Sequence, residues 1–476
     1  MPKTFYITNP IFYPNAKLHL GHAYTTTISD ILARYHRLIG DKTYFLTGSD
    51  ENTQKVVQAA KEARQDPKIF LDKIIANFKI LFTNLNISAD QFIRTSDEKT
   101  HWPGAQALWN KLVASGDIEK REYKGLYCIG HESFITEKDL VDGKCPDHGT
   151  FPQEIKEENY FFRLSKYTKE IKKKIESDEI KIIPETRKNE IISLLNDGLQ
   201  DVSFSRPKTA VSVGIPVPGD DSQVMYVWCD ALSNYITALG YGTADDSLYK
   251  EFWPADVHVI GKDILRFHAA IWPAMLLSAG LPLPKSILVH GLIRSGGKKM
   301  SKSLGNVIDP EELISEYGTD AVRYYIARHI SLFEDGEITR ESFKEAYNAG
   351  LANGLGNLVS RIMKMATTNL EGPIELKKFE FHKDYKDAFS SLNIQKVTEI
   401  VWDHIAATDF LIQTREPFKL VKTNKLEAQK VITDLCGSLY MIGELLIPIL
   451  PETAQTIQTL IKENKMPDKP LFVRKD

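Results

Sequence analysis

Two histidines, three residues apart, open a predicted helix near the N-terminus. They are His19 and His22, and they follow a short alternating apolar segment at 3–8 that predicts a strand. The helix is predicted over 23–39 and stops at Gly40. A helix start offers unpaired N–H groups and a positive dipole end to an anion. The spacing therefore indicates a site for nucleotide phosphates. The alternative is a polar helix start that binds no phosphate.

Gly21, between the two histidines, lets a flat ligand lie against the backbone. A second basic stretch lies far downstream at 296–303, where glycines precede Lys299 and Lys302. Such a loop can close on a polyphosphate and stabilise the charge that develops during transfer. Alone it is also compatible with a surface turn, but it complements the histidine pair.

Strands alternate with helices over much of the chain, which predicts a Rossmann-like α/β fold with a doubly wound parallel sheet. In such sheets, ligands gather at the carboxyl ends of strands. Asp50 follows one of these strands, where it could pair with an ammonium group or cap the next helix. The later predicted strands lie at 42–47, 92–97, 225–230, 257–263 and 286–290.

The middle of the chain changes character, because 123–162 is rich in glycine, turn residues and aromatics. It contains two knuckles with metal-ligand spacing, which suit tetrahedral zinc. The alternative is a pair of buried cysteines with two surface histidines. A lysine-dense helix is predicted at 169–181. Its lysines by default indicate a solvated face, and the alternative is a nucleic-acid contact. The knuckle residues are Cys128, His131, Cys145 and His148.

The composition is that of a globular protein of roughly three domains. The 476 residues carry a net charge of −3, so any nucleic-acid contact must use local patches. Four cysteines in a chain of this length favour a reducing compartment and argue against a disulfide framework. No apolar run approaches the ~20 residues of a membrane span, and no signal-peptide pattern precedes the first strand.

From about residue 343 onward the apolar spacing is helical throughout and predicts an all-α bundle. The segments with this spacing lie at 351–365, 394–414 and 428–446. The periodicity alone does not say what the bundle binds.

Taken together, these motifs closely resemble the methionyl-tRNA synthetase family of class I aminoacyl-tRNA synthetases. The histidine pair and the lysine loop at 299–303 mark the class, and the segments at 226–231 and 261–274 look like the methionine member. The resemblance covers nearly the whole chain. It implies ATP-dependent ligation of L-methionine to tRNA through a methionyl-adenylate, with Mg-ATP as the nucleotide substrate and structural zinc in the knuckle.

The resemblance also implies a domain organisation and the role of each site residue. The implied units are a first catalytic half at 1–115, an inserted connective segment with the zinc knuckle at 116–204, a second catalytic half at 205–290, a mobile lysine loop and linker at 291–342, and an α-helical anticodon-binding domain at 343–476. The implied site comprises His19, His22, Lys299 and Lys302 for catalysis; Gly21, Gly261, Asp263 and Lys302 for ATP; and Ile11, Tyr13, Asp50, Trp228, Ala231, Tyr235, Ile264, His268 and Trp272 for methionine.

In the bundle, Asn357 and Arg361 match the family's anticodon-reading pair, and Phe418 takes the place of its usual stacking tryptophan. Phenylalanine can still stack a base, with less area. Two further departures are Asn52-Thr53, where the family often has His-Gly, and His131, where it often has cysteine. The implied partners are initiator and elongator methionine tRNAs. We expect a monomer, because the chain ends soon after the bundle, and we expect it to be cytoplasmic.

Three other interpretations compete with this one. Synthetases for leucine, isoleucine and valine carry a large editing insertion, and the interval 116–204 is too short for that insertion together with the knuckle. A small-molecule nucleotidylyltransferase shares a similar histidine pair but has no need of the bundle. A non-catalytic tRNA-binding paralogue would not require the histidine pair and both loop lysines.

Overall fold

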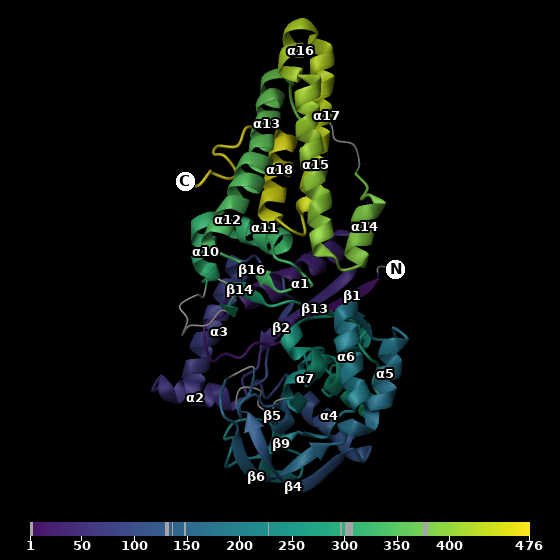
Figure 1. Cartoon of the computed structure of the whole chain (residues 1–476). Coiled ribbons are helices and arrows are strands. Elements are labelled where there is room, and N and C mark those ends of the chain that lie inside the picture. The colour runs from purple at the N-terminus through teal and green to yellow at the C-terminus, as the bar shows by residue number, and fades with distance from the viewer. Residues whose placement is uncertain are drawn as a thin grey trace.

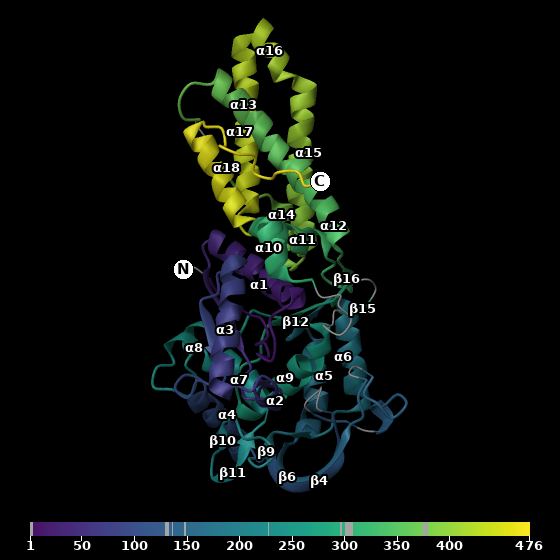
Figure 2. The ribbon, with the colours of Figure 1, turned by 90° about the vertical axis from the view of Figure 1, so that its left-hand side faces the viewer.

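The computed structural model describes residues 3–128, 133–135, 137–146, 149–226, 228–295, 298–299, 308–374 and 379–476, and for 54–55, 133–134 and 298–299 it describes the backbone only. A parallel sheet occupies the middle of an elongated molecule (Figures 1 and 2). A helical bundle stands at one end, and smaller antiparallel sheets lie at the other.

The central sheet has six parallel strands in the order β3-β2-β1-β12-β13-β7. From β1 the chain moves outward through β2 and β3, whereas β12 and β13 extend the other side. The strand order thus reverses between β1 and β12, and ligands bind beyond the carboxyl ends at such a switch point. The bounds are β1 Thr4–Thr8, β2 Lys42–Ser49, β3 Gln91–Arg94, β7 Lys181–Ile183, β12 Val257–Gly261 and β13 Ser286–His290.

Alternate residues of each strand point to opposite faces of the sheet, and both faces are covered. Phe5 and Ile7 belong to one apolar core, whereas Tyr6 belongs to the other. The first core includes α1, α3 and α11 and continues into the bundle, and the second includes α4, α7 and α9. The predicted doubly wound α/β layer is confirmed. The bounds are α1 Leu20–Leu38, α3 Pro67–Asn84, α4 Trp102–Ala114, α7 Trp228–Thr237, α9 Trp272–Ala279 and α11 Thr319–His329.

The connective segment forms an antiparallel sheet of its own, in the order β5-β4-β6-β8. It also supplies β7, the edge strand of the central sheet, from inside the range 116–204. The lysine-dense helix is shorter than predicted, because it ends at Glu176 and Lys181 already lies in β7. The bounds are β4 Ile118–Cys128, β5 Ser133–Ile135, β6 Gln153–Phe162, α5 Thr168–Glu176, α6 Glu185–Asp197 and β8 Val202–Ser203.

The prediction of a parallel-sheet strand at 225–230 is wrong. Met225 ends β11, which pairs antiparallel with β10 on one side and β9 on the other. The turn at Gly219, whose φ is +84°, closes β10 and β11 into a hairpin. Both edges of β11 are therefore occupied, and the chain enters α7 at Trp228. The bounds are β9 Ser205–Pro207, β10 Pro216–Val217 and β11 Asp220–Met225.

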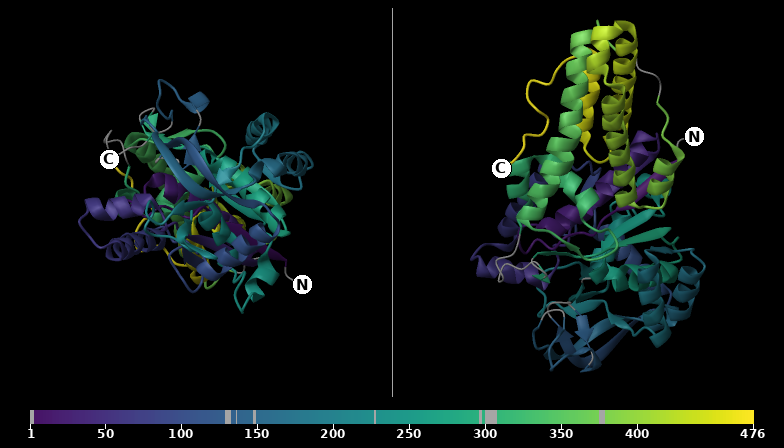
Figure 3. Two further views of the ribbon diagram at one scale, coloured as in Figure 1. Left: turned by 90° about the horizontal axis from the view of Figure 1, so that it is seen from below. Right: turned by 45° about the horizontal axis from the view of Figure 1, so that its top comes forward.

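The C-terminal region is helical, as predicted, and its long helices run along the bundle axis (Figure 3). None of the helices in the described part of the chain combines the length and apolar character that a membrane crossing requires. The bundle comprises α12 Arg340–Ala346, a wide π-type helix Tyr347–Gly356, α13 Asn357–Asn369, α14 Lys383–Ser390, α15 Ile394–Arg415, α16 Pro417–Thr423, α17 Lys425–Leu446 and α18 Pro451–Glu463. The remaining elements include α2 Gln54–Glu62, α8 Ser247–Phe252, α10 Pro310–Tyr317, β14 Ile293–Ser295, β15 Lys298–Lys299 and β16 Gly336–Glu337.

Arg323 on α11 is a fully buried cation that joins the sheet layer to the bundle. Its guanidinium lies 2.8 Å from the carboxylate of Asp30 on α1 and donates to the carbonyl of Leu85 at 3.1 Å. It also donates to the carbonyls of Pro448 and Ile449, at 3.0 and 2.9 Å. Burial alone would raise the pKa of Asp30, but Arg323 and neighbouring donors outweigh it and lower that pKa. The pair therefore stays ionised.

Replacement of Arg323 should strongly destabilise the fold. Arg323→Met removes one of the two cations that compensate buried Asp30, the other being Arg34 at 2.7 Å, and it leaves three buried carbonyls without their donor. Breaking a buried pair in this way costs about 3–5 kcal/mol. The exposed ion pair of Arg340 with Glu312 supplies the control, since Arg340→Met should cost less than about 1 kcal/mol. Urea unfolding followed by circular dichroism measures both. Equal midpoints for the two variants would contradict this account of the junction.

Candidate active site

The paired histidines begin helix α1. The backbone of His19 is extended, with φ −112° and ψ 177°, and its Nδ1 accepts a hydrogen bond from the amide of Gly21 at 3.0 Å. The amide of His19 in turn donates to Nδ1 of His22 at 3.1 Å. The ring centroids are 3.9 Å apart. The pair thus caps the helix reciprocally, as Ser and Glu do in a capping box.

These bonds fix which ring nitrogen carries the proton. A neutral imidazole has one donor and one acceptor nitrogen, and here Nδ1 of each ring is the acceptor. Burial lowers the pKa of His22 well below its ordinary value, and the neighbouring His19 adds to the lowering because two adjacent imidazoles resist being charged together. Each ring therefore presents Nε2–H as its donor, at the positive end of α1. Such donors can hold a phosphate oxygen.

Gly21 is required here because of a close approach. A Cβ at this position would lie 2.9 Å from Cε1 and 3.0 Å from Nδ1 of His19. Such contacts force the ring to move, so any side chain at residue 21 would disturb the histidine cap.

The loop from Asn9 to His19 is attached to the end of β2. The amide of Phe12 donates to the carbonyl of Gly48, and the amide of Asp50 donates to the carbonyl of Phe12, both at 3.0 Å. Gly48 allows the loop and β3 to approach closely, because a Cβ there would lie 3.0 Å from Cγ2 of Ile11 in the loop and 2.3 Å from the carbonyl oxygen of Ile93 in β3. The loop carries half-buried Ile11 and Tyr13, and this register holds it beside the buried Asp50.

The predicted adenosine residues lie at the end of β12, across the switch point from the histidines. A Cβ on Gly261 would lie 2.6 Å from Oδ1 of Asp263, so the glycine lets that carboxylate approach the backbone. His290, at the end of β13, links this side to α1 through a 2.8 Å contact between its Nε2 and Oγ1 of Thr25. Burial lowers the pKa of His290, and nearby Asp263 partly opposes the lowering. Sequence analysis assigned no role to His290.

Aromatic and imidazole rings gather beside α7 and α9. Nε2 of His268 accepts from the hydroxyl of Tyr235 at 2.7 Å, and its Nδ1 donates to the carbonyl of Ile264 at 3.0 Å. Burial lowers the pKa of His268 to about 4, so the ring is neutral near pH 7. The Tyr235 ring lies 6.0 Å from that of Trp272. Burial raises the pKa of Tyr235, and Asp50 adds to the rise from close by.

His258 on β12 is a member of this cluster that sequence analysis missed. Its Nε2 accepts from the indole of Trp272 at 3.3 Å, and its Nδ1 donates to Oγ1 of Thr8 at 2.6 Å. Its ring centroid lies 4.4 Å from that of Tyr235. His258 therefore connects two predicted methionine-contact residues, Trp272 and Tyr235, to β1. The only feature of the sequence that could have identified His258 is its position within a buried strand.

The remaining predicted pocket residues, Trp228 and Ala231, occupy the start of α7, and both are buried. The Trp228 ring stacks on Phe267, with centroids 3.4 Å apart and planes 11° apart. Ala231 stands one helical turn before Tyr235, so the two side chains share a face of α7.

A buried polar network fastens α7 to the end of β2. The amide of Asn52 donates to Oδ2 of Asp230 at 2.8 Å and to the carbonyl of Thr95 at 2.9 Å. Nε2 of His101 lies 2.7 Å from Oδ1 of Asp230, and its Nδ1 lies 2.7 Å from Oγ1 of Thr237. Asn52 marks one of the departures from the family pattern, and here its amide holds the helix that carries Trp228.

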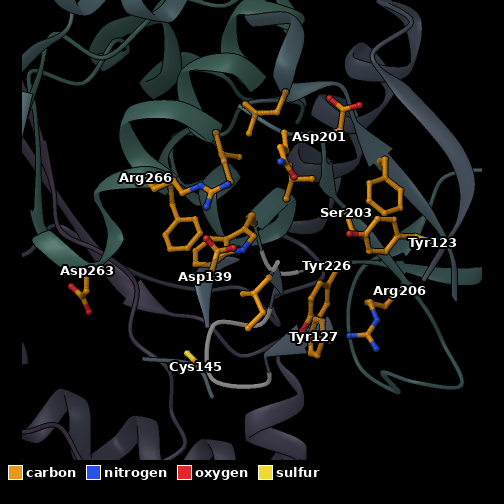
Figure 4. A pocket seen from close by; sticks show the side chains of 18 of the residues that line it. Tyr123, Tyr127, Asp139, Cys145, Asp201, Ser203, Arg206, Tyr226, Asp263 and Arg266 are labelled. Atoms are coloured by element: carbon orange, nitrogen blue, oxygen red, sulfur yellow. The ribbon is translucent and has the colours of Figure 1, made fainter. Parts of the chain in front are cut away.

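A cavity of about 310 Å³ opens between the connective sheet and residues 263–271 (Figure 4). Tyr127 and Tyr226 line it, and the guanidinium of Arg206 lies over both rings at 4.6 and 5.2 Å. Trp228 and Asp263 also border it, so the cavity adjoins the methionine-side and nucleotide-side residues alike.

The predicted zinc ligands fall partly outside the described residues, where His131 and His148 lie. Cys128 ends β4, and Cys145 lies in the turn region that follows; both are buried. Within the described part of the chain, no cluster of three or more potential metal ligands occurs. Two buried thiols close to the connective sheet are compatible with a zinc knuckle, since thiolates are preferred zinc ligands.

The lysine loop is also described only in part. Lys299 lies in β15, whose backbone pairs antiparallel with β14, and Lys302 lies outside the described residues.

The predicted anticodon residues lie in α13 and α16 of the bundle, and α16 stands at the end of the bundle that points away from α1, the helix that the histidine pair begins (Figure 1). Asn357 and Phe418 are exposed, and Arg361 is half-buried. Asn357 and Arg361 share one face of α13, and Phe418 lies in α16 at the tip.

The family model described as "tRNA synthetases class I (M)" matches residues 5–153 and 148–363. The methionine–tRNA ligase of Clostridium acetobutylicum is 45% identical over 96% of this chain and 73% of its own length, and that of Thermotoga maritima is 39% identical over 98% and 76%. Mycobacterium tuberculosis methionyl-tRNA synthetase in complex with methionyl-adenylate superposes with a TM-score of 0.91 at 35% identity, covering 99% of this chain and 100% of that one. Its free form gives a TM-score of 0.83 at 33% identity, covering 100% and 99%.

Fold, site and sequence thus agree on a class I aminoacyl-tRNA synthetase. The chain belongs to the methionine-specific family of that class.

Gly21→Ala should greatly reduce amino-acid activation, because the added methyl group displaces His19 from the cap. We expect a loss of at least about tenfold in ATP–pyrophosphate exchange, since one misplaced hydrogen-bond donor to developing charge costs at least that much. Gly437→Ala is the matched control. A Cβ at Gly437 meets no atom within 4 Å, and the change adds helix propensity within α17. Similar rates for both variants would contradict the proposed geometry.

Titration of His268 should leave the Michaelis constant for methionine unchanged between about pH 5.5 and 7.5. The pKa of this ring is lowered to about 4, so the neutral, hydrogen-bond-accepting form persists as pH falls through that window. Protonation would break the bond from Tyr235 only near pH 4. A rise of the Michaelis constant centred at about pH 6.5 that disappears in His268→Gln would show an ordinary histidine instead.

Proposed function

We propose that this chain ligates L-methionine to its cognate tRNA at the expense of ATP, through a methionyl-adenylate. The observation that carries the proposal is the placement of the paired Nε2–H donors of His19 and His22 across a switch point from Gly261 and Asp263, beside the aromatic cluster. An anion site and an apolar side-chain pocket therefore open at one edge of one sheet. The superposition on a methionyl-adenylate complex supports the same assignment.

In the first step, a carboxylate oxygen of methionine attacks the α-phosphorus of Mg-ATP. The bond from that phosphorus to the α,β-bridging oxygen breaks, and pyrophosphate leaves with that oxygen. Positioning and charge stabilisation dominate, since the step requires little proton transfer. His19 and His22 hold phosphate oxygens through Nε2–H, and Lys299 and Lys302 neutralise the departing pyrophosphate. Gly21, Gly261 and Asp263 hold the adenosine, with Asp263 accepting from a ribose hydroxyl.

The methionine side divides into a charged and an apolar part. Asp50 holds the ammonium group, and the aromatic residues surround the thioether, since sulfur packs favourably against ring edges. Neutral His268 stays bound to Tyr235, so the pocket presents no charge to the side chain. In the second step, a hydroxyl of the terminal tRNA ribose attacks the carbonyl carbon of the adenylate, and AMP leaves. The apolar lining comprises Ile11, Tyr13, Trp228, Ala231, Tyr235, Ile264, His268 and Trp272.

The bundle at 343–476 reads the anticodon of methionine tRNAs, initiator and elongator alike. Asn357 and Arg361 offer amide and guanidinium donors on one helical face, and Phe418 offers an exposed ring for stacking. One structural zinc is held by Cys128, His131, Cys145 and His148, and elemental analysis of the purified chain tests this part. We further propose a monomer that acts in the cytoplasm, where the cysteines remain reduced.

The decisive experiment is ATP–pyrophosphate exchange with each amino acid in turn, followed by charging of methionine tRNA. Exchange with methionine and transfer to that tRNA are expected. Exchange only with another amino acid would favour a different class I synthetase. Exchange or nucleotidyl transfer without any amino acid would favour a small-molecule nucleotidylyltransferase. Tight tRNA binding without exchange would favour the non-catalytic paralogue.

A further inference from the structure

The residue that follows Asp50 is a second buried carboxylate. Glu51 is 1% exposed and Asp50 is 3% exposed, so two adjacent acidic side chains are removed from water at the end of β2. Two carboxylates placed in this way compete for protons, because the negative charge of each raises the pKa of the other. The carboxylate proposed to hold the methionine ammonium group therefore needs the charge of its neighbour to be compensated.

Arg94 supplies this compensation from the end of β3. It lies opposite Ser49 in the parallel register of β2 and β3. Its Nε donates to Oε1 of Glu51 at 2.8 Å, and its Nη2 donates to Oε2 at 3.0 Å. The hydroxyls of Ser49 and Ser96 donate to the same carboxylate. A bidentate pair of this kind fixes the orientation of both groups as well as their charges.

Arg94 remains a cation in this partly buried position. Burial alone would lower the pKa of its guanidinium, but Glu51 and then Asp72 outweigh burial and raise that pKa. Asp72 on α3 lies 2.7 Å from Nη1 and is 51% exposed, whereas the side chain of Glu51 is fully buried. Because exposed ion pairs contribute little, Glu51 is the principal partner of Arg94.

The charge of Asp50 reaches the proposed methionine pocket. It adds to the rise that burial causes in the pKa of Tyr235. A change in the ionisation of Asp50 therefore changes the field in which the substrate binds. The other titratable groups around this corner are Tyr13 in the loop that is held beside Asp50, His22 against Phe12 of that loop, His268 bonded to Tyr235, and the pair of His101 and Asp230, which Asn52 contacts.

We propose that Arg94 is a positioning residue for methionine, which compensates the charge of Glu51 so that Asp50 stays ionised and directs one negative charge at the substrate ammonium group. Without Arg94, the two adjacent carboxylates share a proton near neutral pH, and the charge that meets the ammonium group varies with pH. The proposal rests on the role proposed above for Asp50, and it adds the residue that keeps this carboxylate ionised.

The test measures the Michaelis constant for methionine in ATP–pyrophosphate exchange at about pH 5.5 and 7.5, and the inhibition constants of two probes. L-Methioninol keeps the ammonium group and the side chain, whereas 4-(methylthio)butanoate lacks the ammonium group. In Arg94→Met, the constants for methionine and methioninol should rise about tenfold relative to the wild-type chain as pH falls, because a carboxyl with a raised pKa takes up a proton in this range. The constant for 4-(methylthio)butanoate should follow that of the wild-type chain.

Three further variants make the result specific. Glu51→Gln keeps the shape and leaves the guanidinium uncompensated, so it should weaken methioninol about fivefold at both pH values. This variant carries the test if Arg94→Met does not fold. The double variant Glu51→Gln/Arg94→Met removes both charges and should restore the wild-type pH profile. Asp72→Asn removes only the exposed partner of Arg94 and should leave all three constants unchanged.

The wild-type pH profile in Arg94→Met together with unchanged constants in Glu51→Gln would overturn the proposal. A pH-independent loss of all three ligands in Arg94→Met that the double variant does not repair would also overturn it, because Arg94 would then only support the fold.

Asp50→Asn separates this failure from a failure of the proposed function. If Asp50→Asn weakens methioninol but not 4-(methylthio)butanoate, and Arg94→Met behaves as the wild-type chain, only the role of Arg94 is wrong. If Asp50→Asn affects both probes alike, the ammonium-binding role of Asp50 is wrong.

Discussion

The buried pair of Arg323 and Asp30 fixes the position of the helical bundle relative to the sheet layer. Asp30 lies on α1, eight residues beyond His22, so the helix that presents the histidine pair is the helix that the guanidinium holds. The same guanidinium binds two carbonyls at the base of α18. A buried arginine tolerates little displacement, because every lost bond leaves a desolvated group unpaired. The phosphate site and the bundle tip are thereby kept at a fixed separation, as a substrate that must touch both requires.

Much of the fold was predictable from local pattern. Strands β1, β2, β12 and β13 are short apolar runs bounded by turn residues, and α1 has helical periodicity ending at Gly40. The histidine pair was found because its spacing is itself a chemical signal, whereas the roles of the residues after β12 came from the family resemblance. The helical bundle was equally clear, since its apolar spacing extends over long segments. Each of these features is encoded within a few residues of where it appears.

The features that sequence analysis missed depend on distant partners. β7 is three residues long, and it is a strand only because β13 lies beside it. The sequence before Trp228 is typical of a parallel strand, but this segment pairs antiparallel with β10 in a hairpin. His258 acquires its role from Thr8, 250 positions away, and Asn52 acquires its role from Asp230. No local pattern distinguishes such residues from ordinary members of a core.

Central to the proposed function is that one edge of the central sheet activates methionine before tRNA takes part. A single-turnover experiment with radiolabelled methionine, Mg-ATP and excess enzyme, in the absence of tRNA, tests it most directly. The account predicts one enzyme-bound methionyl-adenylate per active site, whose methionyl group moves to methionine tRNA when the tRNA is added. No adenylate before tRNA addition, or a bound adenylate that is not transferred, would contradict it.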